Sequence, residues 1–253
     1  MHMFRAVLAA VLLLLSASMA WADSPLTSTD FYQAYMHIPQ VAQAHQLGQL
    51  DQGLCDYLHD PANPIDAKAA VINALEPAII GQGLDGTLTP NRSATLRGYL
   101  AQRYGGAPDN LPYDAISPAE LMCLGYLVVM ENDYLVDSSL ALHQGIDLIT
   151  RAQNNSGGSR TIDVVKSLCL AQSLFRESWC GVWVVVSEAV KRQGVVEDLD
   201  PNALAIILDY IGLYQPDCAT VMEPVDAGFY GAGGYTGGDA SQGGGFESGN
   251  PKY

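Results

Sequence analysis

The chain has 253 residues, of which 49% are hydrophobic, and a net charge of −15 at pH 7. This hydrophobic content can form a real core, which excludes a chain that is disordered throughout. Only 12 basic residues stand against 27 acidic ones. Nucleic acid and anionic membrane surfaces are therefore poor candidate partners, because phosphate groups are bound by clustered Lys and Arg.

The first 22 residues have the pattern of an export signal. Arg5 provides a basic start, residues 6–15 form an apolar run, and Ala20-Trp21-Ala22 is a small-x-small cleavage site. The apolar run is too short for the roughly 20 residues of a spanning helix. We expect cleavage after Ala22, no stable membrane insertion, and a mature protein that is periplasmic or secreted.

Residues 23–225 are predicted to form an all-α domain. Apolar residues recur at helical spacing in a series of segments separated by short turns, without βαβ alternation. We expect helices at 31–38, 47–58, 65–80 with a kink at Pro77, 93–104, 119–130, 134–153, 159–193 as a hairpin, and 202–214. Four of the segments follow a capping residue and a proline, which is a helix-start signal: Asn63-Pro64, Thr89-Pro90, Ser117-Pro118 and Asp200-Pro201.

Residues 159–193 form the densest apolar run outside the leader. The polar group Arg176-Glu177-Ser178 interrupts the run, which predicts two antiparallel helices around which the other helices pack. Residues 182–186 have the composition of a strand, but their helical surroundings favour a helix.

Helix pairs begin near residues 117, 159 and 200, at steps of about 41 to 42 residues. That period is typical of HEAT or armadillo arrays. Residue identity between the three segments is poor. The sequence therefore leaves two architectures open, an irregular helical bundle and a short α-solenoid of helical hairpins.

The cysteines are widely spaced. Export favours disulfides, but the pairing cannot be deduced, and buried thiols are an equal alternative. The disulfide candidates are Cys55, Cys123, Cys169, Cys180 and Cys218. The chain has no C-x-x-C or H-x-x-x-H pair, so we expect neither a metal site nor a cofactor.

Residues 226–253 form a glycine-rich segment, with ten glycines between Gly228 and Gly249. Such a composition loses much backbone entropy on ordering, so the segment is predicted to be a flexible tail. Aromatic residues punctuate the glycines and are the predicted binding residues of a weak multivalent segment: Phe229, Tyr230, Tyr235 and Phe246. The alternative is an inert tail.

Catalytic motifs are incomplete in this chain. The alternative to a non-enzymatic protein is a periplasmic or secreted hydrolase that uses a carboxylate acid/base pair. Glu177 and Glu188 lie within the apolar hairpin and are each a candidate for one of the carboxylates, on the condition that it is buried and its pKa is thereby perturbed. The turn between the two helices is expected to separate them. His59 stands at the predicted end of a helix, where a favourable interaction with the helix dipole explains it.

The step Cys123-Leu124-Gly125-Tyr126 resembles the C-x-G-Y step of small periplasmic immunity proteins of the Tai type. This resemblance covers four residues and implies a periplasmic inhibitor or immunity function. The function that we expect from the whole pattern is different. It is an exported non-enzymatic protein that acts in protein–protein interaction, or as a structural component, in the envelope or extracellular space.

Overall fold

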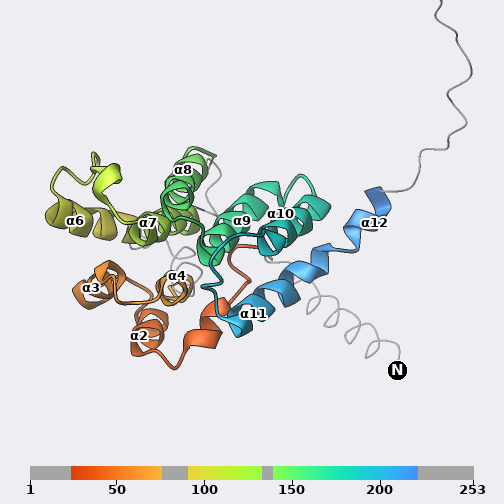
Figure 1. The fold of residues 1–253 in the computed structure, drawn as a ribbon, viewed down its shortest axis with the longest axis horizontal. Helices are drawn as coiled ribbons and strands as arrows, with labels where there is room; N and C mark the ends of the chain where they lie inside the picture. The colour runs from red at the N-terminus through yellow and green to blue at the C-terminus, as the bar shows by residue number, and fades with distance from the viewer. Residues whose placement is uncertain (1–23, 76–90, 133–138, 222–253) are drawn as a thin grey trace, which may run out of the picture. The chain divides into compact units, whose positions relative to one another are not determined.

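The computed structural model describes residues 24–75, 91–132 and 139–221 (Figure 1). All of them belong to the first of two units into which the chain divides, Met1–Val221 and Met222–Tyr253. The predicted leader lies outside the described residues, and so do Pro77 and the glycine-rich segment with Phe229, Tyr230, Tyr235 and Phe246. The predicted domain boundaries after residues 22 and 225 stay predictions.

The described residues form helices and no strand, so the all-α prediction is confirmed. The elements are η1 (Phe31–Tyr35), α2 (Pro39–Leu47), α3 (Gln52–His59), α4 (Ile65–Asn73), α6 (Arg92–Tyr104), η2 (Tyr113–Ala115), α7 (Pro118–Asn132), α8 (Ser139–Asn155), α9 (Arg160–Leu174), α10 (Trp179–Lys191), α11 (Pro201–Ile211), η3 (Gly212–Tyr214) and α12 (Asp217–Val221). The 3-10 helices η1 and η3 are tighter than the α-helices that the periodicity predicts at these two places.

Side-chain caps begin several of these helices, as their sequences indicate. The carboxylate of Asp200 accepts a hydrogen bond from the backbone N–H of Asn202 at 2.7 Å, which confirms this predicted start. The prediction for Asn63 as a cap is wrong. Its amide donates instead to the carbonyl oxygen of Tyr57 at 2.8 Å, and Pro64 takes the capping position of α4.

The most buried helix is α7, and every residue from 121 to 130 is buried. It packs against α3, α4, α6, α8 and α9, and Figure 1 shows it between α6 and α8. The prediction that the hairpin at 159–193 is the centre of the fold is only partly correct. Its first helix α9 is deeply buried, but α10 buries one face on α9 and leaves Trp179 and Val184 exposed. A helix that is apolar all round, as α7 is, fits a central position better.

The chain reverses between α9 and α10, where the carbonyl oxygen of Leu174 accepts from the N–H groups of Glu177 and Ser178, both at 2.8 Å. The predicted helical hairpin is therefore confirmed. Residues 182–186 lie inside α10, so the strand alternative is wrong.

Tyr35 connects the first described helix to the start of α11. Its hydroxyl donates to Asp66 at 2.8 Å and accepts from the N–H of Asp200 at 3.2 Å. Accordingly η1 packs against both α4 and α11. In a solenoid each repeat contacts only its neighbours. The contact between η1 and α11, which are far apart in the sequence, therefore favours the irregular bundle, although α7, α9 and α11 begin close to the three predicted positions.

Candidate functional site

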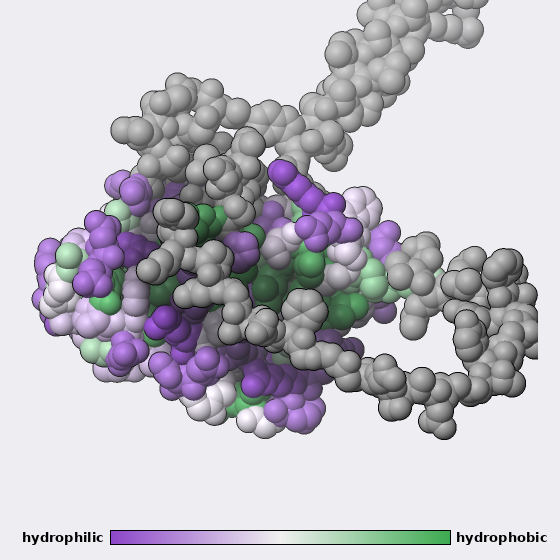
Figure 2. Space-filling model, turned by 90° about the horizontal axis from the view of Figure 1, so that it is seen from above, coloured by the Kyte–Doolittle hydropathy of each residue, from purple (hydrophilic) through white to green (hydrophobic). Residues whose placement is uncertain are grey.

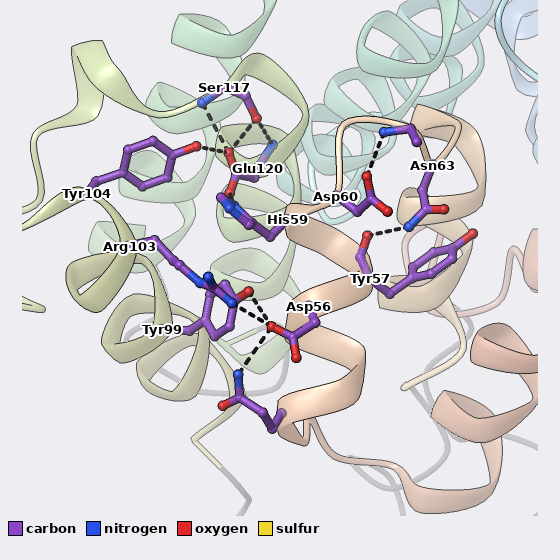
Figure 3. A network of polar contacts seen from close by, with 12 residues as sticks. Asp56, Tyr57, His59, Asp60, Asn63, Tyr99, Arg103, Tyr104, Ser117 and Glu120 are labelled. Atoms are coloured by element: carbon purple, nitrogen blue, oxygen red, sulfur yellow. Dashed lines mark hydrogen bonds and ion pairs between the residues drawn. The ribbon is translucent and has the colours of Figure 1, made fainter.

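A buried carboxylate, Glu120, organises a polar network at the start of α7 (Figure 3). Ser117 and Glu120 form a capping box in which each side chain bonds the backbone of the other. The carboxylate oxygen Oε2 accepts from the Ser117 N–H at 3.2 Å and from its hydroxyl at 2.5 Å, while the Glu120 N–H donates to Ser117 Oγ at 3.4 Å. The side chain of Glu120 is only 1% exposed.

Two aromatic side chains complete the coordination of this carboxylate. Tyr104 donates its hydroxyl to Oε2 at 2.7 Å, and His59 Nδ1 lies 2.7 Å from Oε1. Burial and the neighbouring carboxylate raise the pKa of Tyr104 to about 12, so the phenol stays a donor at neutral pH. The network therefore joins the end of α3, the end of α6 and the start of α7.

Asp56 makes a second connection between α3 and α6. Its Oδ1 accepts from Tyr99 at 2.6 Å and from Arg103 at 2.8 Å, and the guanidinium lies over the Tyr99 ring at 4.9 Å from the centroid. The hydrogen bond from Tyr99 holds the pKa of Asp56 below its usual range. Burial, followed by that same hydrogen bond, raises the pKa of Tyr99 to about 12.

This arrangement resembles a catalytic base in one respect, because Glu120 orients His59 through Nδ1. A nucleophilic dyad also needs a hydroxyl or thiol in reach of the histidine. In the described parts of the chain no Ser, Thr or Cys side chain hydrogen-bonds His59. Within the described residues the contacts of Glu120 and His59 therefore join α3, α6 and α7.

Glu177 and Glu188 do not meet the condition that made them catalytic candidates. Both are exposed, Glu177 in the turn after α9 and Glu188 on α10. Glu188 Oε1 lies 3.4 Å from Lys191 Nζ in a surface pair. No hydrogen bond or ion pair within the described residues joins the two carboxylates, so the structure does not bring them together.

One disulfide forms, between Cys180 on α10 and Cys218 on α12. The other three cysteines, Cys55, Cys123 and Cys169, are buried thiols. Burial raises the pKa of Cys55 to about 11 and that of Cys123 to about 12, which keeps both in the unreactive thiol form. The sequence left both outcomes open, and the structure contains both.

An aromatic cluster lies beside the disulfide, where α10 packs against η3. The ring of Tyr214 contacts those of Phe175, Trp179 and Tyr210 edge-on, with centroids 5.9 to 6.4 Å apart. Trp179 is nevertheless 56% exposed, and Leu213 is 64% exposed. We call the exposed Trp179 and Leu213, together with the buried Tyr214 ring that Trp179 contacts, the α10–η3 surface. Figure 2 shows, on the face seen from above, that the described surface carries a hydrophobic area bordered by hydrophilic residues.

Sequence reasoning missed Glu120 and the α10–η3 surface. The spacing Ser117-x-x-Glu120 is a capping-box signal that was present in the sequence. The partners His59 and Tyr104 come from other helices, so no local pattern could find them. Within the described ranges no helix is long and apolar enough to cross a membrane. Comparison with protein-family models, with curated proteins and with solved structures found no match to this chain.

Proposed function

We propose that this is an exported, non-enzymatic protein that binds a protein partner through the α10–η3 surface. The observation that carries the proposal is Trp179, a large apolar side chain that is exposed although it is held in place by an aromatic cluster. Tryptophan is enriched among the residues that dominate binding energy, and exposed apolar side chains held rigidly lose little entropy on binding.

The charge near the α10–η3 surface indicates what kind of partner fits. Glu177 lies two residues before Trp179, and Asp209 lies one helical turn before Leu213; both acids are exposed, and the exposed Arg176 precedes Glu177. From Gln193 to Pro251 the sequence has no Lys or Arg. We therefore expect a partner that inserts an apolar side chain beside Trp179 and surrounds it with Lys or Arg.

The Cys180–Cys218 bridge supports the export half of the proposal, since disulfides persist in oxidising compartments outside the cytoplasm. No observation favours the alternative functions. The candidate carboxylates Glu177 and Glu188 are exposed, and the Cys123–Tyr126 step is buried in α7.

The test starts with the mature chain as bait for envelope and culture-supernatant proteins, followed by purification of the captured partner and titration calorimetry. Trp179→Ala should weaken the measured affinity at least tenfold, because truncating such a residue costs about 2 kcal/mol or more. Leu140→Ala is the control, since Leu140 on α8 is an apolar residue that is 68% exposed, somewhat more than Trp179.

The affinity should also fall as salt is added, because an acidic surface and a basic partner attract each other through a screened interaction. Equal affinity of the Trp179→Ala and wild-type proteins would contradict the proposed surface. The absence of any partner of the wild-type protein in both fractions would contradict the proposed function.

A further inference from the structure

A pocket of about 480 Å³ lies where four segments of the chain meet. They are the start of α4, the start of α7, the turn between α8 and α9, and the segment that follows α10. The volume is in the range of small-ligand sites, which span roughly 300 to 1,000 Å³. The pocket is separate from the residues of the α10–η3 surface.

Three helices present their N-terminal ends to this pocket. Ile65 in α4, Ala119 in α7 and Ser159 at the start of α9 all belong to its lining. First-turn N–H groups have no acceptor inside their own helix, and the helix dipole places partial positive charge there. Among the described residues no group accepts a hydrogen bond from the backbone N–H of these three. The next N–H groups of α9 already donate to Val196, Asp198 and Ser159, so α4 and α7 provide the open helix ends.

Lys68 adds a full positive charge to the same pocket. It lines the pocket, the residue is only 2% exposed, and no described residue forms a hydrogen bond or ion pair with its ammonium group. Its Nζ is not among the fully enclosed side-chain nitrogen atoms of the described residues that lack a partner, so the accessible part of the residue includes the ammonium group. An unpaired ammonium that is largely removed from water favours the binding of an anion. Lys68, rather than the helix ends alone, is therefore the feature that indicates a missing anion.

Two acidic side chains near this pocket already accept hydrogen bonds, which offset part of their negative charge. Asp198 lines the pocket, but its Oδ1 accepts from the N–H of Thr161 at 2.9 Å and so caps α9. Glu120 accepts from Ser117 and Tyr104 and pairs with His59. The negative charge of Glu120 raises the pKa of the Cys123 thiol, and the positive charge of Lys68 lowers it. Both charges therefore act on that thiol at the α4–α7 contact. No ion pair between Glu120 and Lys68 forms.

We propose that this pocket binds a small organic acid, with its carboxylate near Lys68 and the helix N-termini. Its apolar part would lie against Pro61, Pro118 and Val196, which also line the pocket. A carboxylate fits better than a phosphate, because Lys68 is the one basic side chain in the described lining and no arginine is present for bidentate phosphate binding.

The test uses hexanoate as the probe and hexanol as the neutral control of the same chain length, each titrated into the mature protein. Hexanoate should raise the Tm, since a ligand that binds only the folded state stabilises it. In amide NMR spectra it should shift the resonances of Ile65, Ala119 and Ser159. Hexanol should do neither.

Substitutions test whether the ammonium group of Lys68 is responsible for hexanoate binding. Lys68→Met removes the charge and keeps the chain length, and should weaken hexanoate binding at least tenfold, while Lys68→Arg should retain most of it. Lys166→Met is the control, because Lys166 is a partly buried lysine on α9 whose ammonium already donates to Gln153 at 2.7 Å. It should leave hexanoate affinity unchanged.

Undiminished binding by Lys68→Met would overturn the proposal, and so would a wild-type protein that ignores hexanoate at millimolar concentration. Binding of inorganic phosphate without binding of hexanoate would overturn the carboxylate assignment. If Lys68→Met does not fold, the wild-type spectra decide, because hexanoate shifts that spare Ile65, Ala119 and Ser159 would place the ligand elsewhere. Partner binding at the α10–η3 surface is measured separately, so the two proposals can fail independently.

Discussion

Glu120 shows how one residue can determine the arrangement of three helices. Its carboxylate is buried, and it accepts from Ser117 and Tyr104 while it pairs with His59. Hydrogen bonds to a charged group contribute more than neutral ones, and a buried donor that loses its acceptor is costly. The side chain therefore couples a local cap to contacts between distant helices.

We predict that Glu120→Gln lowers the free energy of unfolding by about 2 kcal/mol, because the amide cannot accept from all the donors that the carboxylate satisfies. Urea denaturation followed by circular dichroism measures this change. Glu188→Gln is the control on an exposed glutamate, and should stay within about 0.5 kcal/mol of the wild type. Equal stabilities of Glu120→Gln and wild type would mean that the network is not stabilising.

At the scale of the elements, α7 and α8 approach each other closely at Gly125 and Gly145. A Cβ atom on Gly125 would lie 2.6 Å from the carbonyl oxygen of Gly145, and one on Gly145 would lie 2.7 Å from that of Gly125. Both obstacles are backbone atoms, which cannot rotate away. The glycine of the Cys123–Tyr126 step is therefore required by helix packing.

We predict that Gly125→Ala lowers the free energy of unfolding by about 1 to 3 kcal/mol, the usual range for overpacking a core. Gly98→Ala is the matched control. Gly98 also lies within a helix, α6, but a Cβ there would meet no atom within 4 Å. It should stabilise the protein by up to about 1 kcal/mol, the helix-propensity gain of Ala over Gly. Thermal and urea unfolding of both variants check the opposite signs.

Local signals predicted the elements better than their partners. Periodicity located the helices, and the polar interruption near Glu177 located the turn between α9 and α10. The density of apolar residues wrongly predicted that the hairpin at 159–193 is the centre of the fold. An apolar run does not show whether a helix is covered on one face, as α10 is, or on every face, as α7 is. Contacts such as His59 to Glu120 join residues far apart in sequence, so they follow from tertiary packing alone.

At the scale of the whole molecule, the Cys180–Cys218 bridge ties α12 to α10 across a sequence separation of 38 residues. Closing a loop of that length restricts the unfolded chain and stabilises the folded one by about 4 kcal/mol in the loop-entropy account. A Cys180→Ala, Cys218→Ala double variant should therefore have a lower Tm than the wild type, and reductant should lower the Tm of the wild type alone.

Thiol counting tests the same bridge together with the proposed export. Alkylation followed by mass spectrometry should label no thiol of the native exported protein, because Cys55, Cys123 and Cys169 are buried. It should label three thiols after unfolding, and all five cysteines after unfolding with reductant. A chain expressed without residues 1–22 and kept in the reducing cytoplasm should show five labels after unfolding, without added reductant. Five labels on the unfolded exported chain, before any reduction, would show that the bridge does not form.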